Sequence, residues 1–109
     1  MEKIIFKTSL FDGVKAIKLA ESEFSKEIRI SMAKNSFMDK HKAPAPIIVQ
    51  VLKGSIMFKK DNQEVRLDEF DLITLKADAE HSLLALEDSI IRLSLSKIDN
   101  ESRVFKVVG

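Results

Sequence analysis

The chain contains no cysteine, tryptophan or tyrosine, and it has only three glycines and two prolines among 109 residues. Without cysteine there is no disulfide, no thiolate nucleophile and no cysteine-based zinc or iron–sulfur site. The glycines stand far apart, at Gly13, Gly54 and Gly109, so no glycine-rich phosphate-binding loop is present. These absences exclude several large classes of enzyme before any motif is considered.

An excess of one charge and long apolar runs are also missing. The 18 Lys and Arg nearly balance the 17 Asp and Glu, giving a formal net charge of +1, so no electrostatic case exists for binding nucleic acid or an anionic membrane. The longest aliphatic run, Leu83–Leu86, is far too short to span a membrane. No signal peptide is visible after Met1. We therefore expect a soluble cytoplasmic domain without nucleic-acid or membrane partners.

Hydrophobic residues make up 45% of the chain, which is enough for one packed core. No linker, repeat or low-complexity segment divides the sequence. We therefore expect a single domain over residues 1–109.

Short runs with the two-residue period of β-strands dominate the sequence. Glu27–Met32 alternates polar and apolar residues, and Ile47–Leu52 is so apolar that both its faces should meet protein. Lys60–Gln63 is the expected tip of a hairpin, because Asp and Asn accept left-handed backbone angles. Further strands are predicted at 56–58, 64–67, 72–75, 82–86, 89–96 and 103–108, the last of which can close a sheet edge.

Val14–Ala20 fits either a helix or a strand. We interpret it as a strand, because a turn and the strand at Glu27 follow almost at once. Short strands at such regular intervals are typical of a sandwich or barrel. The predicted fold class is therefore all-β, a small antiparallel β-barrel.

Two stretches of the chain resemble the two motifs of the cupin superfamily. Motif one of the family contains a glycine, two histidines, a glutamate and a closing glycine. In this chain (35–54) those five positions are, in order, Asn35, His41, Ala43, Ile47 and Gly54. Motif two contains a glycine, a proline, a second glycine, a histidine and an asparagine. In this chain (70–85) those positions are, in order, Phe70, Lys76, Asp78, His81 and Ala85. Both spacings fit without a gap, and the intervening segment suits the short hairpin found between cupin motifs.

This resemblance implies a double-stranded β-helix of the jelly-roll type. It also implies a homodimer, because cupins usually pair through outward strand faces and exchanged N-terminal strands. The apolar residues expected on outward faces are Ile48, Leu52, Leu84 and Leu86. Among the replaced glycines, Asn35 and Asp78 tolerate a positive φ, whereas Phe70 does not, which favours a reshaped turn at Phe70.

The departures from the family's metal site are informative. In metal-binding cupins, two histidines and a glutamate of motif one and the histidine of motif two hold one divalent ion. Only His41 and His81 remain here, since Ala43 and Ile47 have no lone pair to donate. Catalytic zinc sites usually have about three protein ligands. We therefore expect no tightly bound metal cofactor; a weak divalent ion, if any binds, would use His41 and His81.

The two-residue period of the strands adds further residues to the expected pocket. Val49 shares a strand face with Ile47, and Leu83 shares one with His81. The resemblance implies that these strand faces point into the barrel. The predicted ligand pocket therefore comprises His41, His81, Ile47, Val49, Met38 and Leu83. The alternative is that the same residues simply fill the core and that each histidine bonds to the backbone or to water.

Three functions remain open at this point. The loss of two metal-ligand positions favours a non-catalytic cupin module that binds a small organic ligand, uncharged or weakly anionic. A metal-dependent cupin enzyme of the dioxygenase, isomerase or decarboxylase type is the alternative, and only His41 and His81 support it. The third possibility is a barrel that serves as a scaffold for a partner protein. No catalytic residue is assigned, and the sequence does not decide whether the protein is an enzyme.

Overall fold

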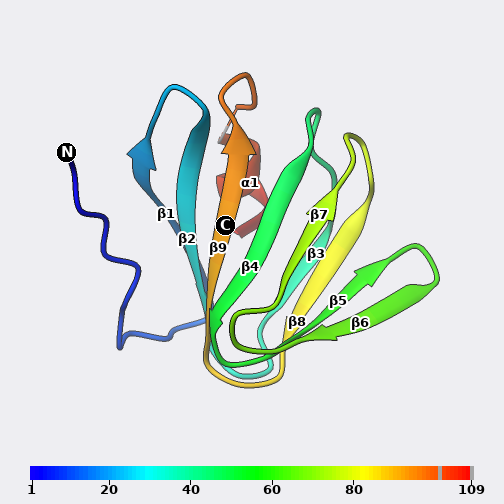
Figure 1. Cartoon of the computed structure of the whole chain (residues 1–109). Helices are drawn as coiled ribbons and strands as arrows, with labels where there is room; N and C mark the ends of the chain where they lie inside the picture. The colour runs from blue at the N-terminus through cyan, green and yellow to red at the C-terminus, as the bar shows by residue number, and fades with distance from the viewer. Residues whose placement is uncertain (101, 109) are drawn as a thin grey trace.

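The computed structural model describes residues 1–100 and 102–108, which form two antiparallel sheets and a short helix (Figure 1). The five-stranded sheet contains, in spatial order, β1 (Val14–Glu21), β2 (Ser25–Met32), β9 (Ser89–Ser96), β4 (Ile47–Lys53) and β7 (Leu72–Leu75). The four-stranded sheet contains β3 (Phe37–His41), β8 (His81–Ala85), β5 (Ile56–Lys60) and β6 (Gln63–Leu67). The predicted all-β jelly-roll class is confirmed.

The alternating sequence pattern positions the core between the two sheets. Ile47, Val49 and Val51 are buried along β4, and Leu83 and Ala85 are buried along β8. The outward residues between them are partly or fully exposed. Burying one face of each strand is the main stabilising contribution of such a sandwich, at about 25 cal/mol per Å² of apolar surface.

The predicted strand at 103–108 is wrong, because this segment forms helix α1 (Ser102–Val108). Val104, Val107 and Val108 recur at the spacing of a helix face, and all three pack against the core. The three valines favour a strand by intrinsic preference, but packing against the core overrides that preference here. The backbone N–H of Ser102 donates to Asn100 Oδ1 over 3.0 Å, which satisfies one of the free donors at the helix start.

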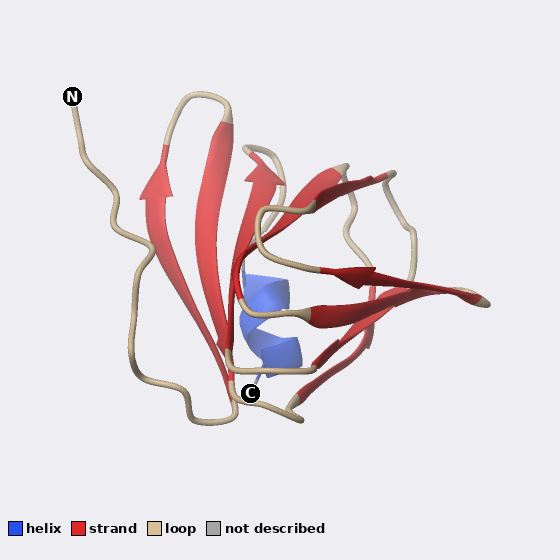
Figure 2. Cartoon of the chain, turned by 60° about the horizontal axis from the view of Figure 1, so that its bottom comes forward, coloured by secondary structure: helices blue, strands red, loops and turns tan. Residues whose placement is uncertain are grey.

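The two sheets do not close into a complete barrel. At one open side, α1 packs against β1 and β3, the edge strands of the two sheets, and Figure 2 shows it between the sheets. At the opposite side, β6 and β7 are the edge strands, and no ladder joins them. Figure 1 shows the β5–β6 hairpin leaning away from β7.

The motif positions that are glycines in cupins keep the glycine conformation. Asn35, Phe70 and Asp78 have φ values of 71°, 73° and 64°, beside 83° at Gly54. The expected reshaping at Phe70 is therefore wrong. Its N–H donates to Val51 O over 2.7 Å, and this bond holds the turn against the steric cost of a left-handed phenylalanine.

The N-terminal residues 1–11 lie outside β1 without joining either sheet (Figure 1). Among the described residues, no helix is both long and apolar enough to cross a membrane.

Candidate functional site

A bulge in β3 brings the two histidines together. The pairing of β3 with β8 places Met38 opposite Leu83 and His41 opposite His81, with a register shift between the two pairs. The extra residue lets both Met38 and His41 face inward although they are an odd number of positions apart. The imidazole centroids are 4.2 Å apart, and the rings meet edge-on with 63° between their planes.

Backbone carbonyls fix the tautomer of both rings. His41 Nδ1 lies 2.7 Å from Asp39 O, and His81 Nδ1 lies 2.9 Å from Ala79 O. A carbonyl oxygen only accepts hydrogen bonds, so each Nδ1 carries the hydrogen and donates it. In the neutral ring, each Nε2 therefore keeps a lone pair. The pair thus presents acceptors rather than donors to a bound molecule.

The electrostatics keep both rings neutral. Burial lowers the pKa of His81 to about 4, with further lowering by the nearby His41 and Arg103, against the opposing hydrogen bond to Ala79. Burial also lowers the pKa of His41, and Arg103 acts in the same direction. At neutral pH the site is therefore two uncharged imidazoles rather than a cationic pair.

Arg103 was missed by the sequence reasoning, because its segment was read as a strand. It donates to the buried carboxylate of Asp99 through Nε (3.0 Å) and Nη2 (2.8 Å). This bidentate pair fixes the start of α1. The guanidinium charge still acts on both histidines, so the helix contributes to the electrostatics of the site.

The cavity around the histidines is almost filled. It has a volume of about 10 Å³, which is room for at most a single water molecule. Five of the predicted pocket residues meet here, together with three residues that the prediction did not include. The full lining is Ile30, Met38, His41, Val49, His81, Leu83, Ile91 and Leu93.

Ile47, the sixth predicted pocket residue, is buried in the core but does not line this cavity. It is the first residue of β4, so it lies at the end of the strand, whereas Val49 lies nearer the histidines. Its neighbours include Pro46 and Phe24 at a shallow depression near the end of the five-stranded sheet.

An open cleft lies between the β5–β6 hairpin and β7. It has a volume of about 450 Å³. Its lining residues are Phe58, Lys60, Gln63, Glu64, Val65, Ile73, Thr74 and Leu75. The sequence carries no local signal for this cleft, because β6 and β7, although successive in the chain, are edge strands of different sheets.

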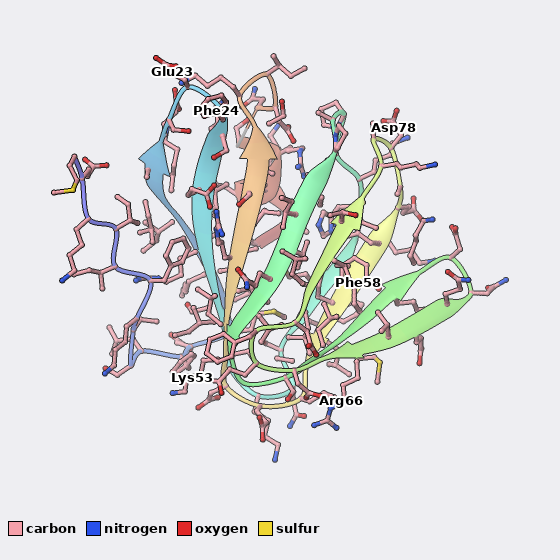
Figure 3. The ribbon with its side chains drawn as sticks, in the orientation of Figure 1. Glu23, Phe24, Lys53, Phe58, Arg66 and Asp78 are labelled. Atoms are coloured by element: carbon pink, nitrogen blue, oxygen red, sulfur yellow. The ribbon has the colours of Figure 1, made fainter. Side chains whose placement is uncertain are left out.

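Phe58 links the cleft to the histidines. Its ring stacks on His81, with the centroids 5.3 Å apart and 17° between the planes. The same side chain lines the cleft, and Figure 3 shows it at the gap between β7 and the hairpin. Phe58 therefore separates the open cleft from the two imidazoles.

The residues present do not fit the metal of metal-binding cupins. Ala43 and Ile47 are buried and have no donor atom. Within residues 1–100 and 102–108, no group of three or more His, Cys, Asp or Glu is placed to hold an ion. Asp39 accepts the backbone N–H of Lys40 within β3 (2.7 Å), and Asp71 accepts that of Asp68 in the turn before β7 (2.8 Å), so both carboxylates already have partners. Two imidazole nitrogens alone make a weak site.

Comparison with known proteins supports the fold. No protein-family model matches the sequence, and no curated protein matches it. Among solved structures, a cupin superfamily protein from Desulfitobacterium hafniense superposes with a TM-score of 0.74 at 16% identity, covering 83% of each chain. An RmlC-like cupin from Desulfovibrio desulfuricans gives 0.75 at 14% identity, over 88% of this chain and 95% of the other. A conserved protein of unknown function from Streptococcus pyogenes gives 0.71 at 20% identity, over 92% and 98%.

The chain therefore has the cupin fold, as the spacing of the two motifs predicted. At these levels of identity the likeness concerns the fold, and function has to be argued from the site itself.

Proposed function

We propose that the protein is a non-catalytic cupin module that binds a small organic ligand in the cleft and at the histidine pair, without a tightly bound metal. One observation carries this proposal: Phe58 both lines the 450 Å³ cleft and stacks on His81. Rotation of this one side chain would connect the cleft to the imidazoles. The volume of the cleft lies within the range of ordinary small-molecule sites.

The chemistry of the lining indicates the kind of ligand. The Nε2 atoms of His41 and His81 accept hydrogen bonds, so they favour a ligand that donates from a hydroxyl or amide. Val65, Ile73 and Leu75 favour an apolar or aromatic body. An uncharged phenol-like molecule satisfies both conditions. Lys60 at the same cleft would also accommodate a weakly acidic ligand.

Imidazole ¹⁵N NMR tests this proposal with phenol as the probe and benzoate and cyclohexanol as comparisons. We expect saturable shifts of the Nε2 resonances with phenol. The variant His81→Gln should weaken phenol binding, whereas Phe24→Ala, which changes an exposed aromatic residue of the β1–β2 turn, should not. Absence of saturable imidazole shifts with all three probes would overturn the proposal.

A metal-dependent enzyme of the cupin type is the second candidate. The observation in its favour is that both Nδ1 atoms bond to backbone carbonyls, the arrangement that also orients metal-binding histidines. Elemental analysis distinguishes the two. Near-stoichiometric iron, nickel, zinc or manganese that is lost in His41→Ala or His81→Ala would restore the enzyme hypothesis.

We further propose that the module acts in the cytoplasm as a homodimer. The support for the dimer is the apolar residues on the outward strand faces, among them Ile48 and Leu84, each 37% exposed. Ile48 lies on the outer face of the five-stranded sheet and Leu84 on that of the four-stranded sheet, and exposed apolar surface on a sheet is typical of an interaction site.

A further inference from the structure

Two depressions on the outer surface of the four-stranded sheet share the side chains of Lys40, Lys59 and Ser82. The first, of about 280 Å³, is called here the apolar depression, and its other lining residues are Phe37, Asp39, Met57, Glu64 and Leu84. The second, of about 300 Å³, is called here the polar depression, and its other lining residues are Asp61, Asn62, Glu80 and His81. Because they share three side chains, the two depressions form one continuous groove.

The strand registers order the side chains of this groove into three tiers. The first tier is apolar and comes from three adjacent strands, with Phe37, Leu84 and Met57. The second tier lies two residues earlier on β8, about 6.6 Å away, where Ser82 is flanked by Lys59 in register on β5 and by Lys40 in the bulge of β3. The third tier lies beyond the start of β8 and carries the carboxylates of Glu80 and Asp61.

The polar groups of the second and third tiers have no partners within the described part of the chain. Ser82 is only 5% exposed, yet no residue of 1–100 or 102–108 forms a hydrogen bond with its hydroxyl. Among the same residues, Lys40 and Lys59 form no ion pair, and neither do Glu80 and Asp61. A molecule in the groove therefore has to satisfy the hydroxyl, and it meets cations and anions that are separated rather than paired.

The outer surface of the five-stranded sheet differs. Its depression of about 270 Å³ around Ile48 is lined by no charged residue. Glu27 on this surface already accepts hydrogen bonds from Arg92 Nε (2.6 Å) and Ser94 Oγ (2.8 Å). The exposed apolar residues of this sheet remain available to the homodimer of the proposed function, and they are Ile17, Ile48 and Leu72.

We propose that the groove binds a zwitterionic amphiphile in which an apolar chain, a phosphodiester and an ammonium group follow one another, as in an alkyl ester of phosphoethanolamine. The chain lies on the first tier. The phosphodiester lies between the two lysines and accepts a hydrogen bond from Ser82, and the ligand's ammonium lies beside Glu80 and Asp61. This second site goes beyond the proposed function. The ring of His81 separates it from the histidine cavity.

Other amphiphiles match only part of the groove. A fatty acid leaves the two carboxylates of the third tier without a cation, and phosphoethanolamine alone leaves the apolar tier uncovered. Asp39 and Glu64 line the apolar depression, so they repel a chain that carries a second anion. A depression of about 280 Å³ fits one short chain, which favours a dissolved molecule over the surface of a membrane.

Isothermal titration calorimetry on the full chain tests the proposal, with hexyl phosphoethanolamine below its micelle concentration as the probe. We expect saturable binding of one molecule per chain. Lys59→Gln and Ser82→Ala should each weaken it at least tenfold, because each removes a charge-assisted contact to the phosphodiester. Lys15→Gln, a matched change in β1, should leave it unchanged. No saturable binding, or binding to phosphatidylethanolamine vesicles without binding to the dissolved probe, would overturn the proposal.

A second probe tests the order of the charges. Hexyl ethyl phosphate keeps the chain and the phosphodiester but lacks the ammonium. The double variant Glu80→Gln with Asp61→Asn should weaken binding of hexyl phosphoethanolamine at least fivefold and should not weaken binding of hexyl ethyl phosphate, whose anion the carboxylates repel. Equal weakening of both probes would contradict the proposed order.

Two controls accompany these titrations. Circular dichroism checks that each variant is folded. Phenol titration of Lys59→Gln reports separately on the proposed function, because Lys59 lines neither the cleft nor the histidine cavity. We expect this variant to bind phenol as wild type does while it loses the phosphoethanolamine ester. Parallel loss of both ligands would show that the groove is not a separate site.

Discussion

Acid should destabilise this protein well above the pH at which its carboxylates titrate, because His81 is buried as a neutral ring. Its pKa falls from 6.5 in an unstructured chain to about 4 in the folded protein. Between these values the unfolded chain binds more protons than the folded one, so stability is lost as the pH falls from 6.5 towards 4. Above pH 6.5 this contribution is fully present.

The size of the effect follows from the pKa difference. Each pH unit within the window is worth about 1.4 kcal/mol, so His81 alone lowers the free energy of unfolding by about 2 kcal/mol at pH 5 and about 3 kcal/mol at pH 4. The lowered pKa of His41 adds in the same direction. A small domain has a total stability of about 5–15 kcal/mol, so the loss is a large fraction of the whole.

The carboxylates change the stability of the protein in a separate, lower pH range. Burial alone would raise the pKa of Glu27, but hydrogen bonds from Arg92, Ser25 and Ser94 outweigh it and lower the pKa below 4.5. The stability that Glu27 contributes is therefore lost only as the pH falls from 4.5 through its lowered pKa. Between pH 6.5 and about 4.5, the change in the free energy of unfolding therefore comes from the histidines.

Urea unfolding across that interval, with wild type and His81→Gln side by side, measures the effect. Wild type should lose stability steeply between pH 6.5 and 4.5, and His81→Gln should lose about 2 kcal/mol less over the same range. A histidine NMR titration of the folded protein gives the pKa directly. A His81 pKa near 6.5, or identical pH dependence in the two proteins, would refute the reasoning.

Three further outcomes are expected. Gly54→Ala should lower the free energy of unfolding by about 2–4 kcal/mol in urea titrations, because φ is 83° and the added Cβ would lie 2.5 Å from Asp88 O; an unchanged midpoint would contradict this. Phe70→Gly should raise it by about 1 kcal/mol by relieving a left-handed phenylalanine, and a loss of stability would count against that strain. Ala43→His with Ile47→Glu should retain a divalent metal through dialysis, as measured by elemental analysis; a folded variant without metal would show that these positions do not converge with the histidines.

Much of the architecture could be predicted because each strand carries its own signal. Alternation along Glu27–Met32 predicts its buried face, and burial in the structure confirms it. For Ile47–Leu52 the expectation that both faces meet protein is wrong, because Ile47, Val49 and Val51 are buried whereas Ile48 on the other face is exposed. The motif spacing also anticipated that His41 and His81 would be neighbours, and their rings do meet. Such features depend on local periodicity and on distances along the chain.

The remaining features depend on long-range packing. β3 was not predicted, because its bulge at Asp39 and Lys40 interrupts the alternation. Helix α1 forms because Val104 fills a gap between the edge strands of two sheets, which no local pattern reveals. The stacking of Phe58 on His81 likewise joins residues from strands that pair only in the folded protein.

A crystal structure of protein purified without chelator, with anomalous scattering data, tests the central claim most directly. The density to inspect lies beside the Nε2 atoms of His41 and His81, and beyond Phe58 in the cleft. We predict an organic molecule or water there, hydrogen-bonded to imidazole, without an anomalous peak. A well-occupied anomalous peak about 2.0–2.1 Å from both Nε2 atoms would identify a bound metal and contradict the account.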